Sequence, residues 1–186
     1  MHIGYICSDA DRRTDEVLSR VADRAARAGI VLGGTVQPVD RSQPAGKYRI
    51  VLRVLPDGPV CDVSMDLGPG ASGCRLDAGA LEEVMVLVND RLPGAQALLV
   101  NKFGKQEAAG RGLVTAIGGC LTERALPVLV GVSPDWLPVF LTFAGGEAQP
   151  LAADEDRVFA WLQAAVARAD AQLPAVEADP SEFPAC

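Results

Sequence analysis

The sequence predicts an α/β fold of three layers: a mainly parallel β-sheet with helices on both faces and an inserted antiparallel hairpin. Short apolar runs that suit buried strands alternate with segments whose apolar residues recur at helical spacing. The composition is 49% hydrophobic and 22% charged, which is typical of a globular protein. A chain of 186 residues is long enough for one domain with a full core.

The first 37 residues read as a strand, a helix and a second strand. The apolar run HIGYIC at 2–7 is followed by apolar residues at helical spacing, which end at Gly29, a residue suited to a helix C-terminus. The sequence VLGGTVQ at 31–37 then reads as a strand. A βαβ unit of this kind implies parallel strands joined by a right-handed crossover.

The middle of the chain is expected to form a hairpin and then return to alternating elements. Residues 48–55 and 60–67 flank the turn sequence PDGP. Asp77 is placed to cap the helix that follows. The elements expected next are a strand at 97–101, a helix at 107–125 and a strand at 127–132.

The C-terminal part is expected to contain an edge strand and a last helix. The segment WLPVFLTF at 136–143 is apolar and rich in β-favouring residues, and Pro138 favours an edge position. Asp154 is placed to cap a helix. We expect a single domain over residues 1–172, with residues 173–186, rich in Pro and acidic residues, poorly ordered.

Charge and composition exclude several classes of function. A net charge of -7 and a pI of about 4.7 argue against nucleic-acid or membrane binding, although a local basic site can still hold a small anion. The N-terminus lacks the pattern of a signal peptide and no long apolar segment is present, so a cytoplasmic location is expected. Five scattered cysteines and the single His2 indicate neither a disulfide framework nor a metal site, and no catalytic residue is assigned.

The loop after the first strand lies where a phosphate loop is expected, because ligands bind beyond the carboxyl ends of the strands in such sheets. A phosphate loop has the pattern GxxxxGK[ST], whose glycines turn backbone N–H groups toward the phosphates. Residues 7–14 read CSDADRRT, and only Thr14 fits. Two interpretations stay open: an ordinary capping loop, and a modified phosphate or anion loop. The second would use Ser8, Arg12, Arg13 and Thr14.

The stretch LLVNKFGKQEAAGRG at 98–112 resembles the second signature of the small nucleoside-triphosphatase family related to the cancer-related NTPases. In that signature a strand ends in Asp-Glu and continues through Gly-Lys-x-Glu. Gly104, Lys105 and Glu107 match, but Asn101 and Lys102 stand where the acids would be. An amide and an ammonium cannot hold Mg²⁺ as two carboxylates do. The resemblance implies a P-loop-NTPase-like fold, and the joint loss of glycines and acids favours a non-hydrolytic protein over an enzyme.

A closer resemblance is to the bacterial family catalogued as domain of unknown function 2478. Its typical segments are present in order: GGTVQ at 33–37, GCRLD at 73–77 and NKFGKQEAAGRG at 101–112. The resemblance covers about residues 2–132, and the segment PVDRSQPAGKYRI is only loosely similar. Members of the family are often encoded beside molybdenum transport or molybdenum-enzyme genes. The resemblance therefore implies a role in handling molybdate or tungstate, with no catalytic residues to carry over.

Molybdate and tungstate are tetrahedral dianions, suited to backbone N–H groups, hydroxyls and a few cations. The glycine-rich loop GPGASG and the end of the next core strand supply such groups. The candidate anion-binding residues are Gly70, Ser72, Gly73, Arg75, Asn101, Lys102, Lys105 and Arg111. Ordinary alternatives stay open: a connecting loop, an ion pair of Arg75 with Asp77 or Glu82, and solvated lysines. Cys74 reads either as a reactive thiol or as a packing residue.

The leading hypothesis is a protein that binds molybdate, tungstate or a related oxyanion for storage, delivery or sensing, with no further cofactor. We expect it to self-associate as a homo-oligomer, because the chain is acidic and its apolar segment 136–143 is expected at a sheet edge. We also expect it to contact molybdenum transport or molybdenum-enzyme proteins. One alternative is a nucleoside-triphosphate-binding enzyme with an atypical phosphate loop, in which Arg13, Thr14, Lys105 and Glu107 take unusual roles. Another is an accessory protein that acts by protein contact alone.

Overall fold

A seven-stranded β-sheet forms the centre of the computed structural model, which describes residues 2–10, 12–40, 49–65 and 76–172. Its strand order is β4-β3-β2-β5-β6-β1-β7. Strands β2, β5, β6, β1 and β7 run parallel, and β3 and β4 are antiparallel at one edge. The bounds are β1 (Ile3–Cys7), β2 (Leu32–Val36), β3 (Val51–Leu55), β4 (Val60–Asp62), β5 (Ala97–Phe103), β6 (Val128–Val132) and β7 (Gln149–Leu151). The predicted mainly parallel α/β sheet with an added hairpin is confirmed.

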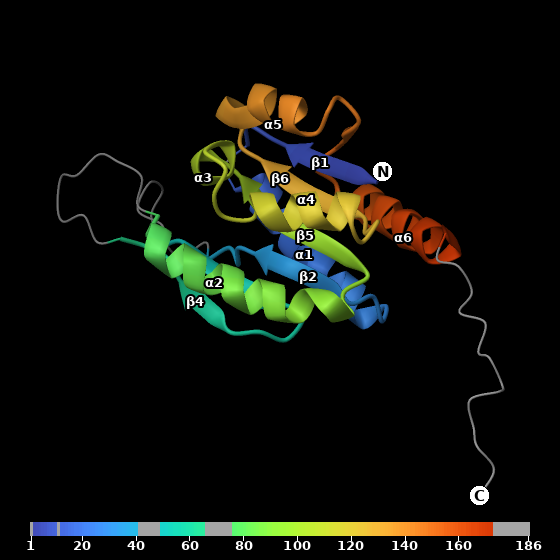
Figure 1. The fold of residues 1–186 in the computed structure, drawn as a ribbon, viewed down its shortest axis with the longest axis horizontal. Helices are drawn as coiled ribbons and strands as arrows, with labels where there is room; N and C mark the ends of the chain where they lie inside the picture. The colour runs from blue at the N-terminus through green and yellow to red at the C-terminus, as the bar shows by residue number, and fades with distance from the viewer. Residues whose placement is uncertain (1, 11, 41–48, 66–75, 173–186) are drawn as a thin grey trace, which may run out of the picture.

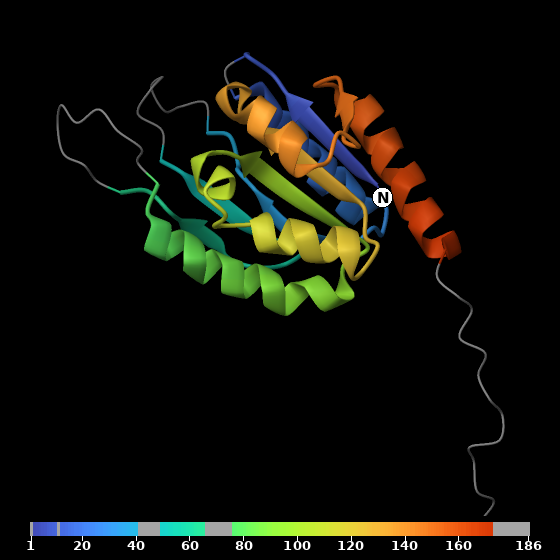
Figure 2. The same cartoon turned by 45° about the horizontal axis from the view of Figure 1, so that its top comes forward.

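Helices cover both faces of this sheet (Figure 1). Two separate cores show the three layers: one holds Leu18 of α1 and Leu162 of α6, the other Val84 of α2, Ile117 of α4 and Phe140 of α5. The turned view in Figure 2 shows α2 and α4 lying along the face opposite α1. The α-helices are α1 (Arg13–Arg27), α2 (Ala78–Arg91), α3 (Lys105–Ala108), α4 (Val114–Thr122), α5 (Leu137–Phe143) and α6 (Glu155–Gln172), and η1 (Leu92–Gly94) and η2 (Pro134–Trp136) are 3₁₀ turns.

The central strands are buried on both faces, which explains their continuous apolar sequences. Every residue of β6 is buried, and in β5 only Lys102 is exposed. Val100 of β5 pairs with Val130 of β6 and with Thr35 of β2, so these three strands end at the same edge of the sheet. This edge therefore gathers loops that are far apart in the sequence.

The helix ends that the sequence predicted are confirmed. The Asp77 carboxylate accepts hydrogen bonds from the backbone N–H groups of Gly79 at 2.9 Å and Ala80 at 3.1 Å. Asp154 accepts one from Arg157 N–H at 3.0 Å. Gly29 follows α1 with a φ of 74°, the left-handed conformation that glycine adopts without a Cβ penalty.

The helix predicted at 107–125 is wrong in its extent. The structure has two helices instead, because Gly110 and Gly112 adopt φ values of 76° and 61° between them. These left-handed residues stop α3 and turn the chain before α4 begins. The apolar spacing of the segment gave no sign of the break.

The edge strand predicted at 136–143 is also wrong, because the segment forms η2 and α5. Pro138 lies in the first turn of α5, where a missing N–H costs nothing, since no helical acceptor exists there. Phe140 is fully buried while Val139 and Phe143 are 40% and 39% exposed, which is the pattern of a helix with one face on the core. The proposed reason for self-association, an apolar sheet edge at this segment, is therefore removed.

The structure differs from the sequence prediction in three smaller ways. The hairpin strands β3 and β4 are shorter than the predicted segments, and the edge strand β7 was not predicted. Strands β1 and β2 are parallel, as expected, but β5 and β6 lie between them.

No helix in the described part of the chain is both long and apolar enough to cross a membrane. The predicted tail, 173–186, lies outside the described residues.

Candidate functional site

A cavity of about 90 Å³ lies at the carboxyl ends of β1, β5 and β6, beside the N-terminus of α1. Three separate segments line it. They are Ser8, Ala10, Arg12, Thr14 and Asp15 after β1, Asn101 and Lys102 in β5, and residues 131–134 at the end of β6. The structure thus brings the predicted first loop together with the residues that follow Val100.

The sheet topology explains why a cavity opens here. From β1 the chain continues through α1, on one face, to β2 on one side. From β6 it continues through α5, on the other face, to β7 on the other side. The loops at the ends of these adjacent strands therefore leave in opposite directions, which is where open α/β sheets bind their ligands.

Asn101 is held against the neighbouring strand by a buried hydrogen bond. Its side-chain Oδ1 lies 2.9 Å from the hydroxyl of Thr35, which is fully buried in β2. Asn101 is 7% exposed and lines the cavity. A short amide in this position reaches the cavity from within the sheet.

Lys102 reaches the same cavity because β5 is irregular at this point. Val100 pairs with Val130 and Phe103 with Val132, so three steps along β5 match two along β6. The extra residue is a β-bulge, a feature that changes the direction of side chains at the end of a strand. Asn101 and Lys102 therefore both line the cavity, although they are adjacent in the strand.

The start of α1 adds a helix N-terminus to the cavity. Arg12 precedes the helix with a φ of 54°, and its own side chain makes no capping hydrogen bond to the first turn. The Arg12 guanidinium donates to the Asp40 carbonyl at 3.0 Å, and the Ser8 hydroxyl accepts from Ala10 N–H at 3.2 Å. Backbone N–H groups in the first turn of a helix favour an anion.

Arg13 belongs to the scaffold rather than to the lining. Its guanidinium donates twice to the carbonyl oxygen of Ala153, at 3.1 and 3.0 Å, and lies 3.9 Å from Glu16. These bonds tie the first turn of α1 to the segment that precedes α6. Of the four residues predicted in the first loop, Ser8, Arg12 and Thr14 line the cavity and Arg13 does not.

The remaining predicted anion-binding residues divide into two groups. Lys105 begins α3 and Arg111 donates to Gln106 Oε1 at 2.9 Å, and neither lines the cavity. Gly70, Ser72, Gly73 and Arg75, with Cys74, lie outside the described residues. This group of candidates contains four cations, Arg75, Lys102, Lys105 and Arg111, and of the three that are described only Lys102 lines the cavity.

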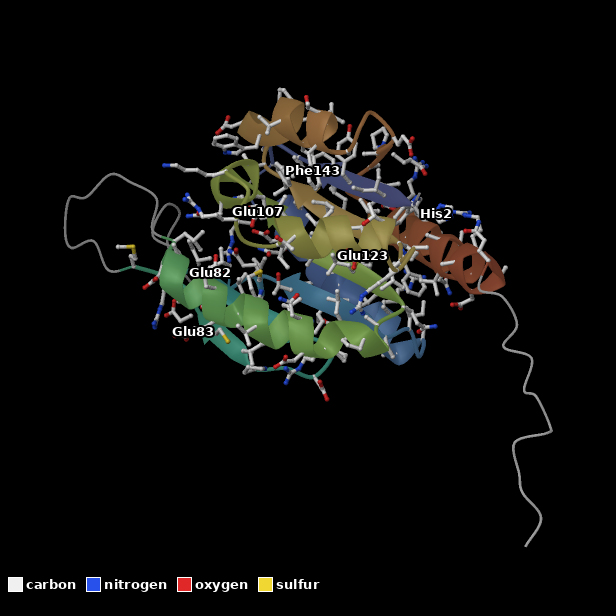
Figure 3. The ribbon with its side chains drawn as sticks, in the orientation of Figure 1. His2, Glu82, Glu83, Glu107, Glu123 and Phe143 are labelled. Atoms are coloured by element: carbon white, nitrogen blue, oxygen red, sulfur yellow. The ribbon has the colours of Figure 1, made fainter. Side chains whose placement is uncertain are left out.

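Glu107 matches the NTPase signature that the sequence resembles, but here its side chain is buried and bonded to the backbone. It is 7% exposed, and its Oε2 accepts a hydrogen bond from Gly104 N–H at 3.0 Å. Burial raises the pKa of this carboxyl, while backbone N–H groups and the nearby Lys102 act in the opposite direction. Figure 3 shows Glu107 at α3, beside the turn that leads into α4. The Glu107 carboxyl therefore stabilises this turn through its backbone hydrogen bonds.

Sequence reasoning missed Thr35 and the β6 end of the cavity. Gly131 lies in the predicted strand, but nothing in its apolar neighbours marks it as lining a site. A Cβ there would collide with the carbonyl oxygen of Asn101, so only glycine permits this approach of β6 to β5. Thr35 belongs to the GGTVQ motif, and that motif is the sequence feature that could have drawn attention to it.

The lining suits an anion better than a cation. Asp15 is the one carboxylate among the described lining residues, which also include the cations Arg12 and Lys102, whereas Mg²⁺ needs several oxygen ligands. Across the described ranges no group of three or more His, Cys, Asp or Glu is arranged to hold a metal ion. The arrangement can donate hydrogen bonds to a small acceptor.

Two solved structures share the fold. The solution structure of a human cancer-related nucleoside triphosphatase aligns with a TM-score of 0.59 at 14% identity, covering 92% of this chain and 99% of that one. The crystal structure of THEP1 from the hyperthermophile Aquifex aeolicus aligns with a TM-score of 0.61 at 12% identity, covering 88% and 96%. This chain therefore has the same fold as these two proteins.

One curated relative is similar in sequence. The molybdenum import ATP-binding protein ModC 2 of Bradyrhizobium diazoefficiens is 31% identical over 148 residues, which are 79% of this chain but 16% of that protein. The chain thus matches a small part of a much longer protein. The model of the family described as protein of unknown function, DUF2478, matches residues 3–161, and the chain belongs to that family.

Proposed function

We propose that this protein is a non-hydrolytic oxyanion-binding protein of molybdenum or tungsten metabolism. The observation that carries the proposal is the pair Asn101 and Lys102, which line the cavity beside the start of α1. An amide, an ammonium and backbone N–H groups all donate hydrogen bonds. A small dianion accepts from all of them.

The size of the cavity supports a small ligand. Its 90 Å³ is well below the roughly 300 to 1,000 Å³ of pockets that hold drug-sized ligands. A tetrahedral oxyanion needs only a few donors around a compact volume. Charge-assisted hydrogen bonds of about 1.5 to 3 kcal/mol each would give micromolar affinity after the cost of association.

The choice of molybdate or tungstate rests on the curated relative. That protein is named for molybdenum import, and the similar segment is a small part of it. We therefore place this chain beside an ATP-driven importer or a molybdenum enzyme, where it would store, deliver or sense the anion. Sulfate has the same shape and charge and is the natural competitor.

A second candidate is nucleotide binding, which the P-loop NTPase fold favours. Thr14 lies at the start of α1 and lines the cavity, as the hydroxyl of a phosphate loop would. Lys105 and Glu107, however, do not line it. Nucleotide-dependent phosphate release that is abolished by Thr14→Ala would support this candidate.

The proposal is tested by calorimetric titration of the purified protein with molybdate, tungstate, sulfate and ATP with Mg²⁺. We expect micromolar binding of molybdate or tungstate, weaker binding of sulfate and no heat from Mg-ATP. Lys102→Ala should weaken molybdate binding by about tenfold, because one charge-assisted contact is lost. Lys105→Ala is the matched control, since Lys105 belongs to the same segment but lies outside the lining.

Two results would contradict the proposal. One is the absence of molybdate and tungstate binding, and tight binding of Mg-ATP would then favour the second candidate. The other is molybdate binding that Lys105→Ala weakens as much as Lys102→Ala, because the anion would then lie outside this cavity.

A further inference from the structure

The GGTVQ motif of β2 lies against the residues that line the cavity, although it does not line the cavity itself. Gly34 has a φ of 107°, and a Cβ on it would collide with the carbonyl oxygen of Leu99. The glycine therefore lets β2 approach β5 very closely. The next residue, Thr35, pairs with Val100 and lies beside Asn101.

The hydroxyl of Thr35 decides which way the Asn101 amide faces. Thr35 is fully buried, and the bond to Asn101 at 2.9 Å is the one side-chain hydrogen bond of its hydroxyl within the described part of the chain. A buried hydroxyl must donate its proton, and an amide oxygen can accept it whereas an amide nitrogen cannot. Oδ1 is therefore turned to Thr35, and the Nδ2 group is left on the side of the cavity.

We propose that Thr35 is a positioning residue that fixes the polarity of the Asn101 amide and so makes the site select anions over cations. The inference deepens the proposed function and rests on it. Without the hydroxyl, the amide is free to turn over and present its oxygen to the cavity. An oxygen there repels an anion and attracts a metal ion.

A double-mutant cycle separates this role from simple support of the strand. Thr35→Val keeps the shape of the side chain and removes the hydroxyl, and Thr35→Ser keeps the hydroxyl. We expect Thr35→Val to weaken molybdate binding by about fivefold and Thr35→Ser by less than about twofold. In an Asn101→Ala background, Thr35→Val should cause no further loss, because no amide remains to be oriented.

Two binding results would overturn the inference: unchanged molybdate affinity in Thr35→Val, or an equal loss in the Asn101→Ala background. The second result would mean that Thr35 supports the strand and does not act through the amide. Mn²⁺ titration adds a readout that strand support alone would not move, since Thr35→Val should bind Mn²⁺ more tightly than the wild type does.

Nuclear magnetic resonance of the wild-type protein tests the orientation without a variant of Thr35. The side-chain NH₂ signals of Asn101, assigned by their loss in Asn101→Ala, should exchange with water and shift on addition of molybdate. Signals protected from exchange would overturn the inference, because Nδ2 would then face Thr35. If the wild type binds neither molybdate nor tungstate, the proposed function fails, while the exchange of these protons still decides the orientation.

Discussion

Asn101 places an uncharged amide in the lining of the cavity. The amide is 7% exposed and already receives a hydrogen bond from Thr35, so a carboxylate of the same size would fit the same place. We predict that Asn101→Asp weakens molybdate binding by about tenfold or more, because it adds a negative charge beside the anion. It should also introduce measurable binding of Mn²⁺.

Calorimetric titration of both ligands checks this prediction. Asn89→Asp is the matched control, because it adds the same charge at an exposed position of α2. Unchanged molybdate affinity in Asn101→Asp would place the anion elsewhere. Equal weakening in both variants would show a general effect of net charge.

Glu107 makes the stability of the folded protein depend on pH, and the burial of its carboxyl sets the sign of that dependence. Its pKa is raised in the folded protein, chiefly by burial, so protonation favours the folded state. The wild type should therefore lose stability relative to Glu107→Gln as the pH rises from about 4.5, the ordinary pKa of the group, through the raised value. Melting temperatures of both proteins between pH 4 and 7 measure the difference. A wild type that instead became less stable than Glu107→Gln as the pH falls toward 4 would contradict this prediction.

At the scale of elements, the turn between α3 and α4 explains why the segment after Gly104 was only partly predicted. The sequence GKQEAAGRG predicts a helix, and a helix does form at Lys105–Ala108. Its end depends on the left-handed conformations of Gly110 and Gly112 and on the packing of Glu107 against Gly112. Spacing along a sequence does not report this contact, because it forms only when the turn is closed.

The two glycines of this turn make a matched pair of variants. We predict that Gly112→Ala lowers the free energy of unfolding by roughly 2 to 4 kcal/mol, because the new Cβ meets the Glu107 carboxylate at a φ of 61°. Gly110→Ala should cost only about 1 to 2 kcal/mol, since its φ is 76° and nothing lies within 4 Å of the new Cβ. Urea unfolding measures both. Equal losses would mean that the Glu107 contact contributes nothing.

The segment 136–143 shows a second limit of local sequence. A short run of apolar residues fits a buried strand and an amphipathic helix equally well. Pro138 was compatible with both, at a strand edge or in a first helical turn. The burial of Phe140 against Phe103 and Tyr5 accompanies the helix, and these partners come from distant strands.

At the scale of the whole molecule, the sequence predicted the layers but not which loops meet. Alternating apolar runs and helical spacing indicate a parallel sheet with helices on both faces, and both features are confirmed. The cavity depends on the strand order β5-β6-β1, which no local pattern reveals. Asn101 was therefore grouped with the glycine-rich loop nearer in sequence, and its position beside the loop after β1 was not predicted.

Ligand binding should raise the stability of the whole fold, because the cavity is assembled from three segments. We predict that molybdate at 100 times its dissociation constant adds about 2.7 kcal/mol, which raises the melting temperature by roughly 5 to 11 °C for a chain of this size. Differential scanning calorimetry measures the shift. Lys102→Ala at the same molybdate concentration should show a smaller shift, and an equal shift would argue against binding at this cavity.

The place of β1 between β6 and β7 has a consequence for synthesis. β1 is the first strand of this sheet to leave the ribosome, but it pairs with its two neighbours only when residues 128–151 have emerged. The clamp from Arg13 to Ala153 closes across 140 positions, which at about 5 to 20 residues per second takes roughly 7 to 28 s of translation. During that interval the nascent chain lacks the β6 part of the cavity, and we expect a truncated product that stops before β6 to show no molybdate binding.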